Sequence, residues 1–217
     1  MKYSILPALI LLAVAPSSGA VLSKPISFSA TRIIEEPAST PIAIRAGDLD
    51  DDGDQDVAYF EGNQSNLWIR HNLGDGQFGD AIMVADAQGG EALDLADVDG
   101  DGDLDILAGF NFNPRRLVWF PNNGDGTFGV EQLLSDTIGQ MATVMFADLN
   151  GDGRPDALVS SPSRSAIVWF ENLGGSFGPE VRLDSNQSRV AGINVGDIDG
   201  DGNLDIVLAA RSSDQVY

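Results

Sequence analysis

The amino-acid sequence predicts an all-β fold, a β-propeller built of four-stranded blades. Two observations lead to this prediction. An acidic nine-residue motif occurs four times, with successive copies 49 to 51 residues apart, and a second motif that contains a tryptophan falls between the copies. A fixed period near 50 residues in a strand-rich chain is typical of propellers and β-solenoids.

Each period contains four short runs rich in valine, isoleucine, leucine and aromatic residues, bounded by glycine, asparagine and aspartate, which is the pattern of strands. The first strand precedes the acidic motif, at residues 42–44, 92–95, 143–146 and 192–195. The second follows it, at residues 56–60, 106–110, 157–160 and 206–209. The third carries the tryptophan, at residues 67–70, 117–120 and 166–170, and the fourth lies at residues 81–85, 130–134 and 179–183. Four antiparallel strands make one blade, and no amphipathic helix is evident.

The composition excludes several classes of protein. The chain has 217 residues, with 33 acidic and 12 basic side chains and a formal net charge of −21. Nucleic-acid binding through general phosphate attraction needs a basic surface, so we expect no nucleic-acid partner. The absence of cysteine excludes disulfides and thiolate metal sites, and the single histidine excludes multi-histidine zinc sites. The 43% hydrophobic content is enough to form a buried core.

The N-terminus has the three-part pattern of a Sec-type secretory signal peptide. Lys2 supplies the positive start, residues 5–15 are apolar, and Ser18 and Ala20 are small residues at a cleavage site. Eleven apolar residues are too few to span a bilayer, which needs about 20. We therefore expect a signal peptide at residues 1–20, a repeat domain at residues 21–217, and a protein that is secreted, periplasmic or on the cell surface, without a membrane span. The alternative is a buried N-terminal segment.

The four acidic motifs, D-x-[DN]-x-D-G-x-x-D, predict calcium sites. Calcium takes six to eight oxygen ligands, many of them carboxylates and backbone carbonyls. Positions 1, 3, 5 and 9 supply side-chain oxygens from Asp48, Asp50, Asp52 and Asp56; Asp97, Asp99, Asp101 and Asp105; Asp148, Asn150, Asp152 and Asp156; and Asp197, Asp199, Asp201 and Asp205. Position 7 can supply its carbonyl, so its side chain is free to vary, as it does in Asp54, Asp103, Arg154 and Asn203. We expect about one Ca²⁺ per loop, four in this chain.

Two other interpretations of these loops are an EF-hand and a set of metal-free acidic turns. Glycine occupies position 6 in every copy, where a sharp turn needs an unusual φ. An EF-hand would have glutamate at position 12 between flanking helices, but here position 12 falls in the following strand. The alternative to a metal site is a set of metal-free acidic turns, although crowded like charges would then repel one another.

Together the acidic loops and the tryptophan-containing segments at residues 68–79, 119–129 and 169–178, which share N-x-G-(D)-G-x-F-G after the tryptophan, resemble the FG-GAP repeats of integrin alpha chains and their bacterial relatives, often called VCBS repeats. The resemblance implies a calcium-stabilised β-propeller, usually of seven blades, with the metal between the first and second strands of a blade. Such propellers serve in adhesion and ligand binding and, less often, as parts of enzymes.

About 200 mature residues at this period give only three to four blades. We therefore expect this chain to be a fragment, truncated in its fourth repeat, with the remaining blades in a missing C-terminal part. A natural short chain that oligomerises to close the ring is the alternative. Residues 27–35 occupy a fourth-strand position with no strands before them, so they are expected to complete the last blade of a ring.

The loops of a blade alternate between two faces. The calcium loops and the N-x-G-(D)-G turns share one face and hardly vary, whereas the loops of the opposite face differ in every repeat, as binding loops do. Five arginines lie in or beside these variable loops, which allows an anionic ligand or, alternatively, ordinary solvated side chains: Arg115, Arg116, Arg164, Arg189 and Arg211. We expect Trp68, Trp119 and Trp169 to be equivalent core residues between blades, and His71 to be exposed and without a role.

These observations favour a secreted calcium-binding module for adhesion or for binding a protein or glycan outside the cell, with structural calcium and no enzymatic activity. No nucleophile elbow, phosphate-binding loop or paired-histidine motif is present. The alternatives are the propeller of a polysaccharide lyase or another carbohydrate-active enzyme, and a wholly structural role.

Overall fold

The computed structural model describes residues 41–217 except for 62–65, 75, 184–188, 211–214 and 217. The chain divides into two compact units, Met1–Ile33 and Ile34–Tyr217, and every described residue belongs to the second. The predicted signal peptide, the expected strand at residues 27–35 and Arg211 lie outside the described residues.

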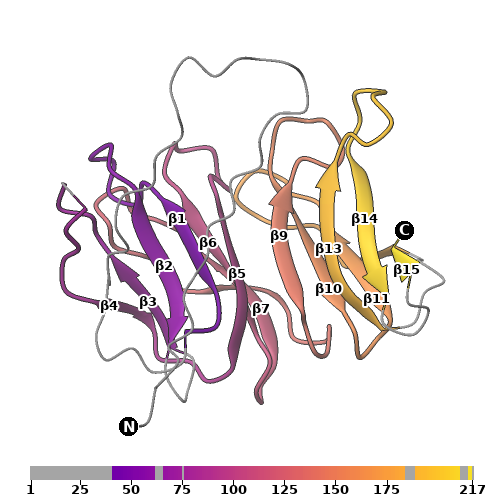
Figure 1. Cartoon of the computed structure of the whole chain (residues 1–217), viewed down its shortest axis with the longest axis horizontal. Helices are drawn as coiled ribbons and strands as arrows, with labels where there is room; N and C mark the ends of the chain where they lie inside the picture. The colour runs from indigo at the N-terminus through magenta and orange to yellow at the C-terminus, as the bar shows by residue number, and fades with distance from the viewer. Residues whose placement is uncertain (1–40, 62–65, 75, 184–188, 211–214, 217) are drawn as a thin grey trace, which may run out of the picture. The chain divides into compact units, whose positions relative to one another are not determined.

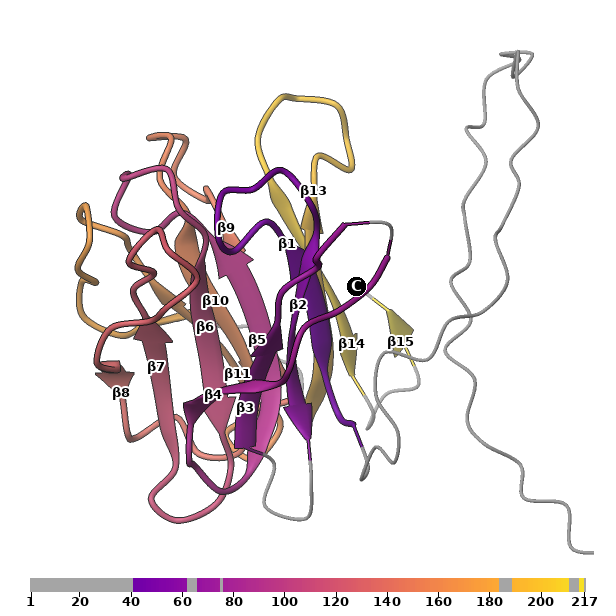
Figure 2. The same cartoon turned by 90° about the vertical axis from the view of Figure 1, so that its left-hand side faces the viewer.

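The described part of the chain is all-β and folds as successive antiparallel sheets (Figures 1 and 2). The first sheet contains β1 (Ile44–Gly47), β2 (Asp56–Glu61), β3 (Asn66–Arg70) and β4 (Ile82–Ala85). The second contains β5 (Gly90–Ala96), β6 (Asp105–Phe110), β7 (Arg116–Phe120) and β8 (Gln132–Ser135). The third contains β9 (Thr143–Ala147), β10 (Asp156–Ser161), β11 (Ala166–Phe170) and β12 (Val181–Leu183). The fourth contains β13 (Val190–Gly196), β14 (Asp205–Ala210) and β15 (Gln215–Val216).

In each sheet the strands pair with their neighbours in chain order, so each sheet is one propeller blade. The predicted fold class is therefore confirmed, with blades that do not close into a ring among the described residues. This part of the chain contains no helix, and hence no helix long and apolar enough to cross a membrane.

The predicted strand positions are confirmed with small shifts. The largest shift is in β1, which was expected at residues 42–44 and is observed at Ile44–Gly47. The reason is its register with β2, which runs from Ile44 opposite Tyr59 to Gly47 opposite Asp56 and so reaches the edge of the acidic loop. Ile42 and Ala43 still exchange hydrogen bonds with the backbone of Phe60, outside this regular register.

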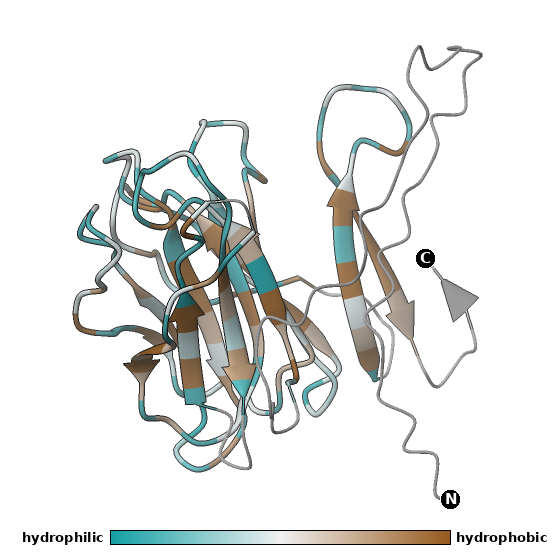
Figure 3. Cartoon of the chain, turned by 60° about the vertical axis from the view of Figure 1, so that its left-hand side comes forward, coloured by the Kyte–Doolittle hydropathy of each residue, from teal (hydrophilic) through white to brown (hydrophobic). Residues whose placement is uncertain are grey.

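The core lies between successive blades, because side chains alternate between the two faces of a strand. Between the first and second blades, the rings of Phe60 and Phe110 meet edge to face at 5.5 Å. Trp119 belongs to the cluster between the second and third blades, and Leu158 to that between the third and fourth. Figure 3 shows the apolar residues concentrated in the strands and the hydrophilic residues in the loops.

The expected equivalence of the three tryptophans is wrong for Trp68. Trp119 pairs with Leu107, and Trp169 with Leu158, each two residues beyond the last aspartate of its acidic loop. Trp68 instead pairs with Tyr59, three residues beyond Asp56. A shift of one residue moves a side chain to the other face of the sheet, so Trp68 lies on the face of its blade that points away from the second blade.

Candidate metal centres

The aspartate at position 1 folds each acidic loop around its own carboxylate. Asp97 Oδ1 accepts the N–H of Gly100 at 2.7 Å, and its Oδ2 accepts the N–H of Gly102 at 3.1 Å. Asp48, Asp148 and Asp197 accept backbone N–H groups of their loops in the same way. The four glycines at position 6 have φ between 86° and 103°, which confirms the predicted turn conformation.

The aspartate at position 9 joins the two sequence motifs into one unit. Asp105 is fully buried, and its two oxygens accept the N–H of Val98 at 2.8 Å and the N–H of Asn122 at 2.7 Å. Asp56 and Asp156 are equally buried and make the same pair of bonds. Val98 is in the acidic loop and Asn122 begins the turn after the third strand, so both motifs lie on one face, as predicted.

Within three of the four loops the carboxylates lie close enough to share one ion. One oxygen each from Asp48, Asp50 and Asp52 lies within 4.8 Å of the others, and the same holds for Asp97, Asp99 and Asp101, and for Asp197, Asp199 and Asp205. Calcium binds oxygens at about 2.3–2.6 Å, so ligands on opposite sides of an ion are about 5 Å apart. The Oδ1 atom of Asp50 is also buried without a hydrogen-bond partner, which leaves it available to a cation. This donor set fits calcium.

Side chains at position 7 face the turn of their own blade. Asp54 Oδ2 and Asp103 Oδ2 lie against Gly74 and Gly124, within 3.6 Å and 2.5 Å of where a Cβ on each glycine would be. Arg154 Nε donates to the carbonyl of Asn172 at 2.9 Å in the same kind of turn. This geometry suits the expected role of position 7, in which only the carbonyl is offered to the metal.

The third loop has the weakest donor set. Asn150 replaces a carboxylate, and its Nδ2 donates to Asp152 Oδ2 at 3.1 Å. The guanidinium of Arg154 also donates to Asp152 Oδ2. A calcium ion in this loop would therefore compete with two donors for Asp152, so we expect its affinity there to be lower than in the other loops.

The prediction that His71 is exposed is wrong. Its side chain is only 17% exposed, and Nδ1 lies 3.1 Å from Asp50 Oδ2 and 3.4 Å from Asp56 Oδ2. The ring also lies beside the next turn, where a Cβ on Gly126 would come within 2.4 Å of His71 Cε1. His71 therefore belongs to the first acidic loop, although its counterparts in the second and third repeats are proline and glutamate.

Burial and crowding disfavour the charged form of several loop carboxylates in the absence of a cation. Burial raises the pKa of Asp105 to about 7, against the backbone hydrogen bonds from Asn122 and Val98, which lower it. Burial, followed by the charge of Asp56, raises the pKa of Asp50. Burial, followed by the charge of Asp101, raises the pKa of Asp99. A bound cation would favour the ionised form of all three groups.

A role that the sequence did not reveal belongs to the asparagine that begins each turn. Asn122 Nδ2 donates to the carbonyl of Leu104 in its own blade at 3.1 Å and to the carbonyl of Leu49 in the first blade at 3.0 Å. Asn172 does the same with Pro155 and, in the second blade, Val98. Leu49 and Val98 occupy position 2 of the preceding acidic loop. Each of these asparagines therefore ties its blade to the acidic loop of the blade before it.

The four arginines of the variable face that the structure describes differ in their partners. Arg116 makes a two-bond ion pair with Glu131 and lies 4.4 Å from the centre of the Phe110 ring. Arg164 pairs with Glu180 at 2.8 Å. Arg115 and Arg189 are exposed, and neither forms an ion pair among the described residues. Two of the predicted anion-binding side chains are therefore already neutralised within the protein.

Each of the four blades has an acidic loop between its first and second strands. This arrangement defines a repeat protein of the β-propeller class. The FG-GAP-like repeat profile matches residues 48–108, 107–159 and 148–208. The chain belongs to this family, as the sequence motifs indicated. No curated protein sequence matches it significantly.

The solved structures that resemble this chain are distant in sequence. A lectin of Agrocybe aegerita that recognises non-reducing terminal N-acetylglucosamine is 23% identical, with a TM-score of 0.57 over 79% of this chain and 49% of the lectin. The Photorhabdus luminescens Tc holotoxin pore is 19% identical, with a TM-score of 0.47 over 78% of this chain and 8% of that chain. The V. cholerae biofilm matrix protein Bap1 is 20% identical, with a TM-score of 0.46 over 80% of this chain and 29% of that protein. The chain thus spans about half the length of the lectin and less of the other two.

Proposed function

We propose that this protein is an exported calcium-binding module that binds a glycan or protein outside the cell, as in adhesion, and that its calcium is structural. The observation that carries the proposal is the difference between the two faces of the blades. One face repeats the same acidic loop in the four blades and the same turn in the first three, where the same hydrogen bonds join loop and turn. The opposite face presents loops that differ in every repeat on this constant scaffold, which is how binding surfaces are commonly built.

The calcium part of the proposal rests on the chemistry of the loops. The side-chain oxygens of positions 1, 3, 5 and 9 and the carbonyl of position 7 would hold the ion. Bound calcium would neutralise the crowded carboxylates and so stabilise the turns that connect the first and second strands. Calorimetric titration with calcium tests this part. The proposal would be contradicted if the titration gave no heat and calcium left the melting temperature unchanged.

The ligand part of the proposal favours saccharides as the first compounds to test. The lectin with a similar fold provides a precedent for sugar recognition by a protein of this shape. We propose binding without catalysis, because the one histidine is engaged with two carboxylates in a metal loop on the face opposite to the variable loops. A glycan array probed with the calcium-loaded protein should give reproducible hits. An array without hits, together with turnover of an acidic polysaccharide, would instead support the carbohydrate-active enzyme.

A further inference from the structure

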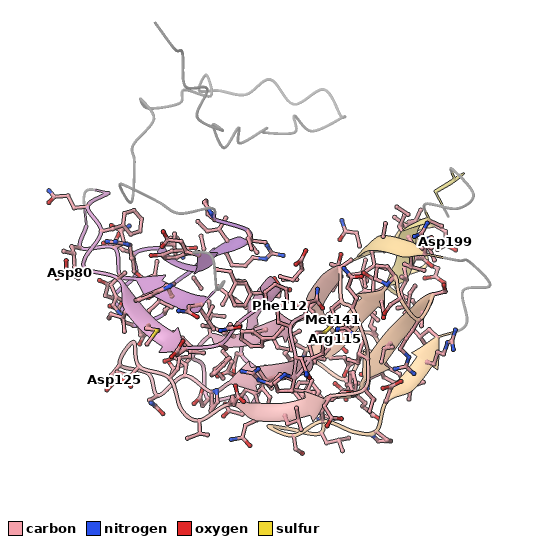
Figure 4. The ribbon with its side chains drawn as sticks, turned by 90° about the horizontal axis from the view of Figure 1, so that it is seen from below. Asp80, Phe112, Arg115, Asp125, Met141 and Asp199 are labelled. Carbon is pink, nitrogen blue, oxygen red and sulfur yellow. The ribbon has the colours of Figure 1, made fainter. Side chains whose placement is uncertain are left out.

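Phe112 is the one aromatic side chain that is exposed among the described residues, with 57% of its surface accessible. It lies in the loop of residues 111–115 between β6 and β7, on the variable face. Figure 4 looks onto this face and shows Phe112 and Arg115 near the middle of the described blades, beside Met141. A single exposed apolar side chain needs no explanation by itself, so the surroundings of Phe112 decide its meaning.

The loop that carries Phe112 is fixed to two other loops. The backbone N–H of Asn111 donates to the carbonyl of Gly89 at 2.7 Å. The side chain of Asn111 exchanges two hydrogen bonds of 2.7 Å with the backbone of Met141, which belongs to the next blade. Gly89 has a φ of 84°, and a Cβ there would come within 2.6 Å of the Phe112 Cβ. Phe112 therefore rests on a bare backbone and is held in an exposed position by its neighbours.

The loop of Met141 is held in turn. The N–H of Gln140 donates to Ser163 Oγ at 2.8 Å, and Ser161 Oγ donates to the carbonyl of Ile138 at 2.8 Å. The variable loops of the second and third blades thus form one connected surface. A surface ordered before binding loses little conformational entropy when a ligand arrives.

Arg115 supplies a charge at the other end of the same five-residue loop. Its Nε donates to the carbonyl of Asn111 at 3.1 Å, which orients the guanidinium and leaves its two terminal nitrogens without a partner among the described residues. Arg116 and Arg164, by contrast, are neutralised by Glu131 and Glu180. An oriented and unneutralised guanidinium is a ready partner for a carboxylate, which it can bind through two parallel hydrogen bonds.

We propose that Phe112 and Arg115 form a binding site for a short saccharide that carries a carboxylate, such as a uronic acid. The apolar C–H face of a sugar ring packs on Phe112, and the sugar carboxylate pairs with the terminal nitrogens of Arg115. The net charge of −21 repels a long polyanion, so the site suits a short acidic sugar better than a heavily charged polymer. This inference rests on the proposed saccharide binding and names its site and ligand class.

The test uses two trisaccharides, trigalacturonate, which carries carboxylates, and α-1,4-galactotriose, which carries none. Each is titrated into the calcium-loaded protein and followed by NMR chemical shifts. Phe112→Ala should weaken binding of both sugars about tenfold, which corresponds to ~1.4 kcal/mol. Arg115→Ser should weaken binding of trigalacturonate by about the same factor and leave galactotriose unchanged.

Two matched controls keep the test specific. Arg164→Ser removes an arginine from the corresponding loop of the third blade, where Glu180 neutralises it, and Leu133→Ala removes an exposed apolar side chain on the outer strand β8. Both controls should bind as the unchanged protein does, and all four variants should keep its melting temperature. If Phe112→Ala and Arg115→Ser bind both trisaccharides as tightly as the unchanged protein does, the proposed site is wrong, although the protein still binds saccharides. Failure of the unchanged protein to bind either trisaccharide, with hits elsewhere on a glycan array, would overturn the ligand class and not the proposed function.

Discussion

Replacing Asn122 with alanine should destabilise the protein far more than the same change at Asn72, although both residues begin equivalent turns. The amide of Asn122 makes three hydrogen bonds, to the carbonyls of Leu49 and Leu104 and from the N–H of Gly124, and the residue is 5% exposed. Asn72 makes only two, to Gln55 in its own blade and from Gly74, and is more exposed. The two variants differ chiefly in the bond to a preceding blade.

The expected magnitude follows from these bonds. A buried hydrogen bond contributes about 0.5–1.5 kcal/mol net, and a buried carbonyl left without a donor adds a further penalty, so Asn122→Ala should cost about 3 kcal/mol. Water can replace the exposed bonds of Asn72, so Asn72→Ala should cost about 1 kcal/mol. In a domain of this size these values correspond to decreases in melting temperature of about 6–12 °C and about 2–4 °C.

Urea unfolding of the calcium-saturated protein, followed by tryptophan fluorescence, measures both variants. The backbone N–H of each asparagine remains and keeps its bond to the buried aspartate, so the comparison isolates the side-chain amide. The dependence of the unfolding free energy on urea should be the same in both variants, since a smaller slope would mean that the blades unfold separately. Equal destabilisation by the two changes would refute the assignment of Asn122 as the tie between blades.

Four further outcomes are expected. Chelation of calcium should lower the melting temperature, since each site adds about 1.4 kcal/mol when calcium is tenfold above its Kd, and thermal melting with and without chelator checks this. Asp99→Ala should remove one calcium ion from the calorimetric stoichiometry, whereas Asp103→Ala, at the carbonyl position, should leave the number unchanged. Arg154→Asp should tighten calcium binding in the third loop by freeing Asp152, so an unchanged set of affinities would contradict the competition described there. In chelator the protein should lose stability as the pH rises from about 4 to about 7. The reason is the raised pKa of Asp105, because of which the folded state binds more protons than the unfolded state in this pH range. Melting temperatures at pH 5 and pH 7.5 should show this trend, and calcium should abolish it.

The sequence predicted the strand positions and the turn conformation within one repeat. The second strands begin within one residue of their expected positions, because the acidic loop fixes where each of them starts. The conformation of the turn glycines follows from the same nine-residue pattern. Such features depend on neighbouring residues in the chain. Because the motif occurs four times, it can be distinguished from an accidental pattern.

What the sequence could not predict depends on contacts between repeats or on single-residue shifts. The bond from Asn122 to Leu49 spans 73 residues, and no pattern within one repeat indicates it. The wrong placement of Trp68 has a simpler cause, because Trp68 lies four positions before Asn72, whereas Trp119 lies only three positions before Asn122. Counting back from the invariant asparagine would have placed Ile69, and not Trp68, at the core position. The neutralisation of Arg116 and Arg164 was missed because Glu131 and Glu180 precede the outer strands, 15 and 16 residues further along the chain.

The ties between blades imply that the proposed calcium sites are not independent of one another. The turns of the second and third blades each contact the acidic loop of the blade before them in two places. The asparagine amide bonds to the residue at position 2 of that loop, and a glycine lies beside the aspartate at position 3. A Cβ on Gly175 would come within 3.0 Å of the Asp99 Cβ, just as one on Gly126 would come within 3.1 Å of the Asp50 Cβ. An ion that orders the loop of one blade therefore also orders the surface on which the next blade packs. Since stability in repeat proteins resides largely in such interfaces, losing calcium from one loop should weaken its neighbour as well, and the ions should stabilise the protein by more than the sum of separate sites.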